Sequence, residues 1–268
     1  MRYNFLNLFS LMFMVTLGVN AQVTDPVPSA LDSIRVIPRP KTAVNFLKLN
    51  LPGLALRQFH VQYEVAVRKK VSLALGVRFM PQGEVPLINT VEQLSGINDP
   101  EFIKILRSVQ INNYAVTPEL RFYPGKKGYG RGFYIAPYYR YLSIDLKSDL
   151  PVEISFDDDS KNQITVSGNI NIHNIGLMIG AQWMLSKRIA LDWWIIGAQA
   201  GFHQAELTGL PKTNFTDNQL KAIRDDIQVN FNNLGQTSII TAEKVKVNTN
   251  AFIAATGLRT GLCLGFRF

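Results

Sequence analysis

The chain has 268 residues, 47% of them hydrophobic, and a formal net charge of +8 at pH 7. Its single cysteine, Cys263, excludes an intramolecular disulfide framework, so other forces must hold the fold together. The basic excess is compatible with nucleic acid or with an anionic membrane surface as a partner, and the export signal at the N-terminus argues against nucleic acid.

The first residues predict a cleaved signal peptide over residues 1–21. Arg2 precedes an apolar run from Phe5 to Val19, and the short side chain of Ala21 precedes a cleavage point before Gln22. The alternative is a membrane anchor, because the run is only slightly shorter than the roughly 20 residues that a spanning helix needs. We favour cleavage because residues 22–41 form a polar, Pro-rich stretch, which is expected to be an extended periplasmic segment.

From residue 42 onward, apolar and polar residues alternate with the period of two that is typical of β-strands. Eight strands are predicted, over residues 43–51, 57–68, 71–80, 114–123, 133–146, 170–184, 188–200 and 258–268. Most are about ten residues long, which suits the roughly 9–11 residues of a tilted strand that crosses a bilayer. Strands of soluble proteins average only about 5–6 residues. The strand length therefore favours a membrane.

Short and long connections alternate along the chain, as they do in outer-membrane barrels with short periplasmic turns and long outer loops. The long connections are residues 81–113, 147–169 and 201–256. Asp99-Pro100-Glu101 predicts the start of a helix over 102–109, and Thr216 or Asp217 predicts a cap for a second helix through residue 231. A hairpin is expected around Asp157–Asp159. An even number of strands places both termini in the periplasm.

The charged residues of the polar strand faces predict a closed barrel rather than a soluble sandwich. Small residues are interspersed with them, which leaves room for long side chains to pair across a narrow lumen. The predicted lumen network consists of Glu64, Arg78, Glu119, Arg121, Arg140, Arg259 and Arg267. The opposite faces carry large aliphatic and aromatic residues, which is typical of lipid-facing surfaces. Closure is also required, because an open sheet edge in lipid would leave backbone groups unpaired.

The last strand ends on Phe268, with Phe266 on the same face, and it resembles the signal that the barrel-assembly machinery reads in outer-membrane proteins. Residues 117–124 also resemble segments common in small, uncharacterised Gram-negative barrels. The chain is thus similar to the small outer-membrane β-barrel family, of the outer-membrane protein A/X type. The resemblance implies an antiparallel up-and-down transmembrane barrel of about eight strands over residues 42–268. Ten strands are the alternative, if part of 236–256 crosses the membrane.

No residue pattern predicts a catalytic site. The three histidines are His60, His173 and His203, and strand pairing sets His60 opposite Arg78 or Met80, several residues from Ser72. His60 is therefore expected to be a hydrogen-bonding group of the lumen. Asp157–Asp159 lack the spacing of a calcium loop, and residues 125–130 lack the strand–helix context of a phosphate loop. We expect no enzyme, no cofactor and no metal.

The sequence favours a non-enzymatic outer-membrane barrel with a structural role or a role in adhesion through its loops. An eight-stranded barrel is just wide enough for side chains to fill, so an open pore is not expected. The expected partners are outer-membrane lipid including lipopolysaccharide, the barrel-assembly machinery and an extracellular ligand. The alternatives are a lipid-modifying barrel enzyme, which would need a polar constellation at the outer leaflet, and a narrow solute channel.

Overall fold

The computed structural model describes residues 44–84, 86, 107–148, 151–156, 160–231 and 235–268. The predicted signal peptide, the Pro-rich segment, the Asp99-Pro100-Glu101 helix start and Asp157–Asp159 lie outside the described residues.

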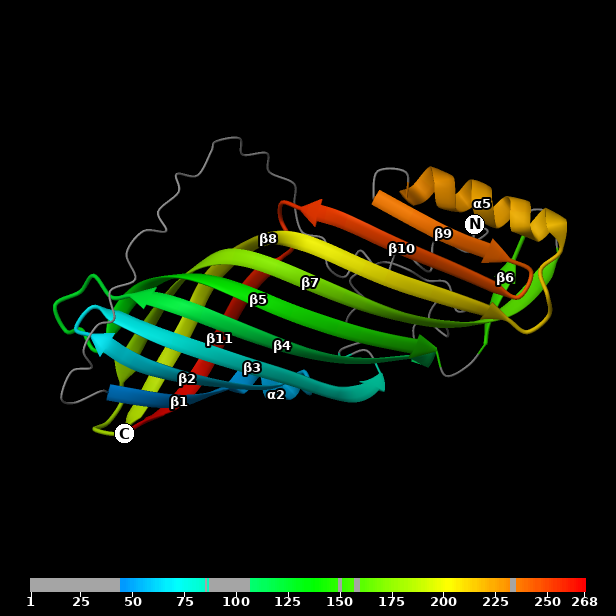
Figure 1. Cartoon of the computed structure of the whole chain (residues 1–268). Helices are drawn as coiled ribbons and strands as arrows, with labels where there is room; N and C mark the ends of the chain where they lie inside the picture. The colour runs from blue at the N-terminus through cyan, green and yellow to red at the C-terminus, as the bar shows by residue number, and fades with distance from the viewer. Residues whose placement is uncertain (1–43, 85, 87–106, 149–150, 157–159, 232–234) are drawn as a thin grey trace.

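Eight antiparallel strands close into a ring, as the sequence predicts (Figure 1). In ring order they are β1 (Val44–Asn50), β2 (Phe59–Arg68), β3 (Val71–Glu84), β4 (Val109–Phe122), β5 (Gly132–Ser148), β7 (Lys161–Met184), β8 (Ile189–Pro211) and β11 (Leu258–Arg267). Strand β11 pairs with β1, and Asn45 and Phe268 exchange two backbone hydrogen bonds of 3.0 Å. The closure leaves no open edge between the first and last strands of the ring.

Several strands are longer than the alternation predicts. β7 has 24 residues and β8 has 23, so both continue well beyond the ring. Most of residues 147–169 and 201–256 is strand, whereas the sequence predicts long connections there, the first with a projecting hairpin and the second with a helix. Three further strands lie in these stretches: β6 (Val152–Ser155), β9 (Gly235–Thr241) and β10 (Lys244–Ile253). We call the part formed by β6, β9, β10 and the outer halves of β4, β5, β7 and β8 the outer sheet.

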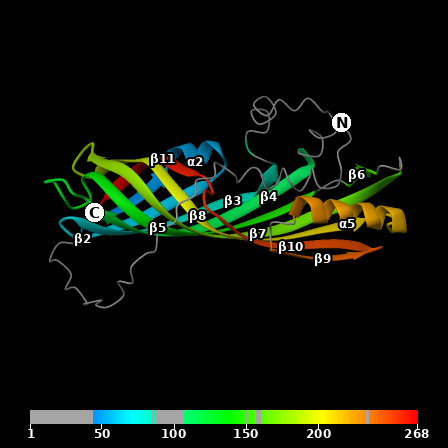
Figure 2. The ribbon, with the colours of Figure 1, turned by 90° about the horizontal axis from the view of Figure 1, so that it is seen from above.

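The outer sheet leaves the number of strands in the ring at eight. β10 pairs with β8 over Gly201–Gly209, whereas β11 pairs with β8 over Ile189–Ala198. β10 therefore continues the line of β11 along the same edge of β8. β6 pairs with β7 and forms the hairpin expected around residue 158. Figure 2 shows the barrel and the outer sheet arranged end to end, with the C-terminus at the barrel end.

Two helices lie among the described residues. α2 (Leu51–Ala55) fills the short connection after β1, and the Gly53 N–H donates to Asn50 Oδ1 over 2.9 Å. α5 (Asp217–Phe231) is the predicted second helix. Thr216 and Gln219 form a reciprocal capping box at its start, with hydrogen bonds of 3.2 and 3.4 Å. Neither described helix is long and apolar enough to cross a membrane.

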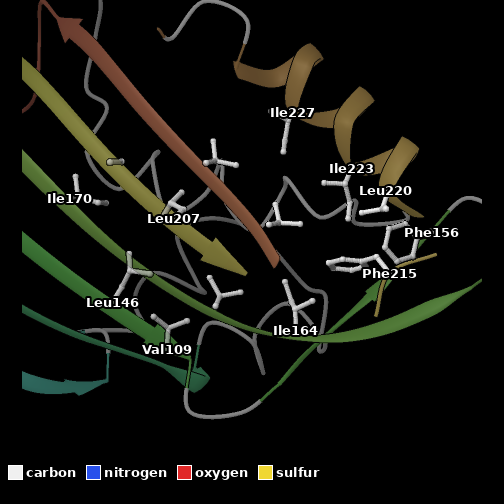
Figure 3. Packing of buried hydrophobic residues seen from close by; sticks show 14 of the residues in the cluster. Val109, Leu146, Phe156, Ile164, Ile170, Leu207, Phe215, Leu220, Ile223 and Ile227 are labelled. Atoms are coloured by element: carbon white, nitrogen blue, oxygen red, sulfur yellow. The ribbon is translucent and has the colours of Figure 1, made fainter. Parts of the chain in front are cut away.

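α5 covers the inner face of the outer sheet. Leu220, Ile223 and Ile227 of the helix are directed toward Ile164 and Leu207 of the sheet (Figure 3). Fifteen buried hydrophobic residues form this cluster, and Ile164 and Ile223 are fully buried. The main apolar core thus lies in the outer sheet, whereas polar residues dominate the interior of the ring. Val109, predicted to end a helix, is instead the first residue of β4.

Candidate functional site

The outward-facing residues of the long strands change from apolar to polar at one level. On β7, Ile175, Leu177 and Ile179 are exposed by 67, 52 and 44% of their surface. Nearer the outer end of the same face lie Asn169 and Asn171. The neighbouring strands change at the same level, because Asn169 pairs with Asp145 of β5 and Glu206 of β8. An apolar belt therefore surrounds the ring and ends at a common height.

Aromatic residues follow the outer edge of this belt from strand to strand. Phe79 and Tyr114 are a register pair of β3 and β4, and Tyr141 and His173 are a register pair of β5 and β7. Tyr114 and Tyr141 are not opposite each other, but their rings meet edge to face at 5.8 Å. The row, which we call the aromatic row, consists of Phe79, Tyr114, Tyr141, His173, Phe202 and Phe252. Aromatic girdles of this kind flank the apolar band of outer-membrane barrels.

At nearly the same level, the inward-facing residues change from polar in the ring to apolar in the outer sheet. On β7, Ile164, Val166, Ile170 and Ile172 face the apolar core of the outer sheet, whereas Asn174 begins the polar interior of the ring. The pairing of β5 with β7 continues through this point without a register shift. A β-bulge would have changed which positions face inward. Since the pairing has no bulge here, the same positions face inward throughout, and only the kind of side chain at them changes.

A charged cluster, which we call the inner network, fills the ring at the level of β1. Lys48 bonds Glu64 and Asp192, the latter over 2.7 Å. Arg121 bonds Asp192 over 2.7 Å, Glu119 over 2.9 Å and Glu64 over 3.2 Å. The side chains of all five residues have no exposed surface. Solvent is therefore excluded from the lumen at this level.

Neutral groups complete the inner network. The hydroxyls of Tyr123 and Tyr134 donate to Glu64 and Asp192, each over 2.8 Å. Arg259 bonds Glu119 over 2.6 Å, so three basic and three acidic side chains balance. β3 contributes only small residues at this level, Ser72, Ala74 and Gly76, and they make room for the long side chains opposite.

The sequence-predicted lumen residues occupy three places. Glu64, Glu119, Arg121 and Arg259 belong to the inner network. Arg78 and Arg140 lie nearer the outer sheet, where Arg78 donates to Gln58 over 3.4 Å and Arg140 has no hydrogen bond to any described residue. Arg267 lies at the inner end of β11, partly exposed and opposite Phe46.

Sequence reasoning missed Lys48, Asp192 and Tyr134 as network members. Each lies at an inward-facing position of a predicted strand, so the alternation could have placed it in the lumen but could not have shown its partners. Their partners come from strands far apart in sequence, with Lys48 and Asp192 separated by 144 positions. No local pattern shows such a pairing.

Potential catalytic groups do not come together in the described part of the chain. His60 pairs with Arg78 as expected, and its ring lies tilted against Trp194 with centroids 5.0 Å apart. Its Nε2 has no partner among the described residues, so the expected hydrogen bond of this atom is absent there. Ser72 pairs with Ala66. His173 faces outward and contacts the Tyr139 hydroxyl at 2.7 Å. Within the described residues, no group of three His, Cys, Asp or Glu side chains is placed to hold a metal ion.

Comparison with known proteins identifies the family. Residues 8–220 match the family described as Protein of unknown function (DUF3575), a span that covers most of the chain. The chain belongs to DUF3575. A major outer membrane protein from Thermus thermophilus is structurally similar, with 13% sequence identity and a TM-score of 0.38 over 85% of this chain and 100% of that one. No curated protein matches the DUF3575 chain.

Proposed function

We propose that this DUF3575 protein is an outer-membrane barrel that holds a rigid binding surface, the outer sheet, outside the cell. The observation that carries the proposal is the polarity inversion along β4, β5, β7 and β8. Below the aromatic row, apolar residues face outward and charged residues face inward; above it, the two faces exchange character. The two faces of a strand that stays in one solvent are not expected to exchange polarity. A strand that passes from a bilayer into water needs an apolar outward face in the bilayer and a polar outward face in water.

The dimensions of the apolar belt support a membrane. On β3, outward residues are apolar from Val71 to Phe79, nine positions, which corresponds to the roughly 9–11 residues of a tilted spanning strand. Basic residues, including Lys69, Lys70 and Arg188, lie at the turns of the opposite end. In this orientation, the export signal and the terminal Phe266 and Phe268 would direct the chain to the barrel-assembly machinery, as in barrels of the outer-membrane protein A/X type.

The proposed role is structural or adhesive rather than catalytic or conducting. The side chains of the inner network are buried, which argues against a solute channel. Outer-sheet residues are the ones that would meet an extracellular ligand. Their core gives that surface a fixed shape, and a fixed shape lowers the entropy lost on binding. The lipid-modifying alternative would need groups that converge at the outer leaflet, and the three histidines do not converge.

Two measurements on cell envelopes test the proposal. Outer-membrane fractions are run on a gel with and without boiling, and a shift that appears only without boiling is expected for a closed barrel. Intact cells are then treated with a protease, with Ile223→Ala as a loosened variant and wild type as its control. Cleavage of the outer sheet in the variant from outside the cell supports the orientation. A band that boiling does not shift, found in the soluble periplasmic fraction, would contradict the proposal.

A further inference from the structure

The outer face of the long strands carries two hollows, one on each side of the aromatic row. The polar hollow has a volume of about 370 Å³ and lies on the outer sheet. Outward-facing polar residues lining it include Asn112, Asp145, Lys147, Asn169 and Glu206. The apolar hollow has a volume of about 1540 Å³ and lies on the belt below. Both hollows extend over β4, β5, β7 and β8.

Small or flat side chains create the apolar hollow. Pro118, Pro137 and Ala198 line it where the rest of the belt carries large aliphatic residues, and Leu120 and Ile175 border it. Because these residues face lipid, the hollow can accept acyl chains without moving the backbone. On β7, Asn169 of the polar hollow and Ile175 of the apolar hollow are six positions apart, about 20 Å along the strand.

The polar hollow is ordered by its own hydrogen bonds. Tyr141 of the aromatic row donates to Asn171 over 2.7 Å, Asn171 donates to Asn169 over 2.5 Å, and Asn169 donates to Asp145 over 2.6 Å. This chain connects the aromatic row to the floor of the hollow. Its amides and carboxylates still have open donor and acceptor positions on their exposed sides.

The charges in the polar hollow favour a hydroxyl-rich group over a phosphodiester. Asp145 and Glu206 are offset by Lys147 and by Lys246, which bonds Glu206 over 2.8 Å. No net positive charge remains to attract a phosphate. Mixed amides and carboxylates both donate and accept, as sugar hydroxyls require, and the aromatic faces of Tyr141 and His173 lie beside them.

We propose that the two hollows form one binding site for an outer-leaflet glycolipid, with its sugar headgroup in the polar hollow and its acyl chains in the apolar hollow. The inference rests on the proposed membrane location, which the polarity inversion supports independently. The aromatic row lies between the two halves, at the depth where the headgroup joins the chains. The site would fix the barrel at one depth in the outer leaflet.

The test uses the full chain, purified in a zwitterionic detergent that has no sugar, and a neutral glycosyl diacylglycerol, which carries no phosphate, as the probe. Bound lipid is measured by mass spectrometry after repurification. D145A/N169A removes polar contacts at two residues and is expected to lower retention about 25-fold, since each of the two lost hydrogen bonds is worth roughly a factor of five. A198F fills the apolar hollow from the lipid side and is expected to lower retention about fivefold. T237A/S238A, at two exposed positions of β9 away from both hollows, is the matched control and should bind as wild type does.

Three results would overturn the inference. Retention that is unchanged in both variants would show that the hollows do not hold the lipid. Equal retention of phosphatidylethanolamine would show that the polar hollow does not select a sugar. A wild-type chain that is heat-modifiable in the outer membrane but does not retain the neutral glycolipid would exclude the site and leave the membrane location intact. A wild-type chain that is not heat-modifiable would instead contradict the location itself.

Discussion

Removal of the Asp192 carboxylate should strongly destabilise the barrel. Asp192 accepts hydrogen bonds from Lys48 and Arg121, each over 2.7 Å, from Tyr134 over 2.8 Å and from Trp194 over 3.2 Å. Both cations are completely buried. In Asp192→Ala, three buried basic side chains of the inner network would face two acidic ones. The remaining positive charge has no route to water.

The expected loss follows from the energetics of buried ion pairs. Breaking one by removal of a single partner costs about 3–5 kcal/mol, because an uncompensated charge stays behind. A loss of about 4 kcal/mol corresponds to a urea midpoint lower by roughly 2 M, for a slope of about 2 kcal/mol per M. Asp192→Asn keeps the shape and some acceptors, so its loss should be smaller. The difference between the two variants separates lost charge from lost packing.

Urea unfolding of the purified chain, followed by the fraction of heat-modifiable band on unboiled gels, measures this effect. Glu153→Ala is the control, since Glu153 pairs with Lys161 on the surface, where the two side chains are 42 and 59% exposed. That variant should unfold within about 0.5 kcal/mol of wild type. If Asp192→Ala unfolds at the wild-type urea concentration, the inner network does not stabilise the barrel and the reasoning is refuted.

Three other substitutions test separate features. Arg140→Met should leave the free energy of unfolding unchanged or raise it by about 1 kcal/mol in the same urea assay, since Arg140 has no hydrogen bond to a described residue and burial of its charge is costly. A large loss of stability would contradict this and show that Arg140 has a stabilising partner. Gly180→Ala should cost about 1–3 kcal/mol by the same assay, because a Cβ there would collide with the ring of Tyr134; wild-type stability would show that the ring can move. Ile223→Ala should destabilise the outer sheet by about 2–5 kcal/mol and speed its proteolysis, while the barrel stays heat-modifiable; loss of both would mean that the two parts unfold together.

The eight ring strands could be predicted because each carries its own alternation, and so could α5, whose start has a local capping signal. The outer halves of β7 and β8 were missed for a physical reason. Ile164, Val166, Ile170 and Ile172 alternate in one phase, and the apolar phase changes to odd positions from Ile175 onward. A phase change usually indicates a bulge or the end of a strand. Here the backbone continues and the surroundings change, so the phase change marks the edge of the apolar belt.

The candidate site was less predictable than the fold. Inward charges such as Glu119 and Arg121 could be predicted from alternation, yet the balance of the inner network depends on Lys48 and Asp192, which distant strands bring together. The two hollows depend on which outward positions carry small side chains on four neighbouring strands. Pro118 and Pro137 are far apart in sequence, and the register of β4 and β5 brings them together, because their neighbours Glu119 and Tyr138 are a pair.

The outer sheet explains why α5 is needed. β1, β2 and β11 end near the aromatic row, so above it the ring is open and the inner face of the remaining strands is no longer closed off by strands opposite. That inner face is apolar, and in water it must be covered. α5 covers it with Leu220, Ile223 and Ile227, and a two-layer packing of helix on sheet results. Since β5 and β7 pass from the barrel into the outer sheet without a break in register, the outward face of the sheet is held at a fixed height and angle relative to the barrel. Such a surface can bind with little loss of conformational entropy, which flexible loops of the same length could not do.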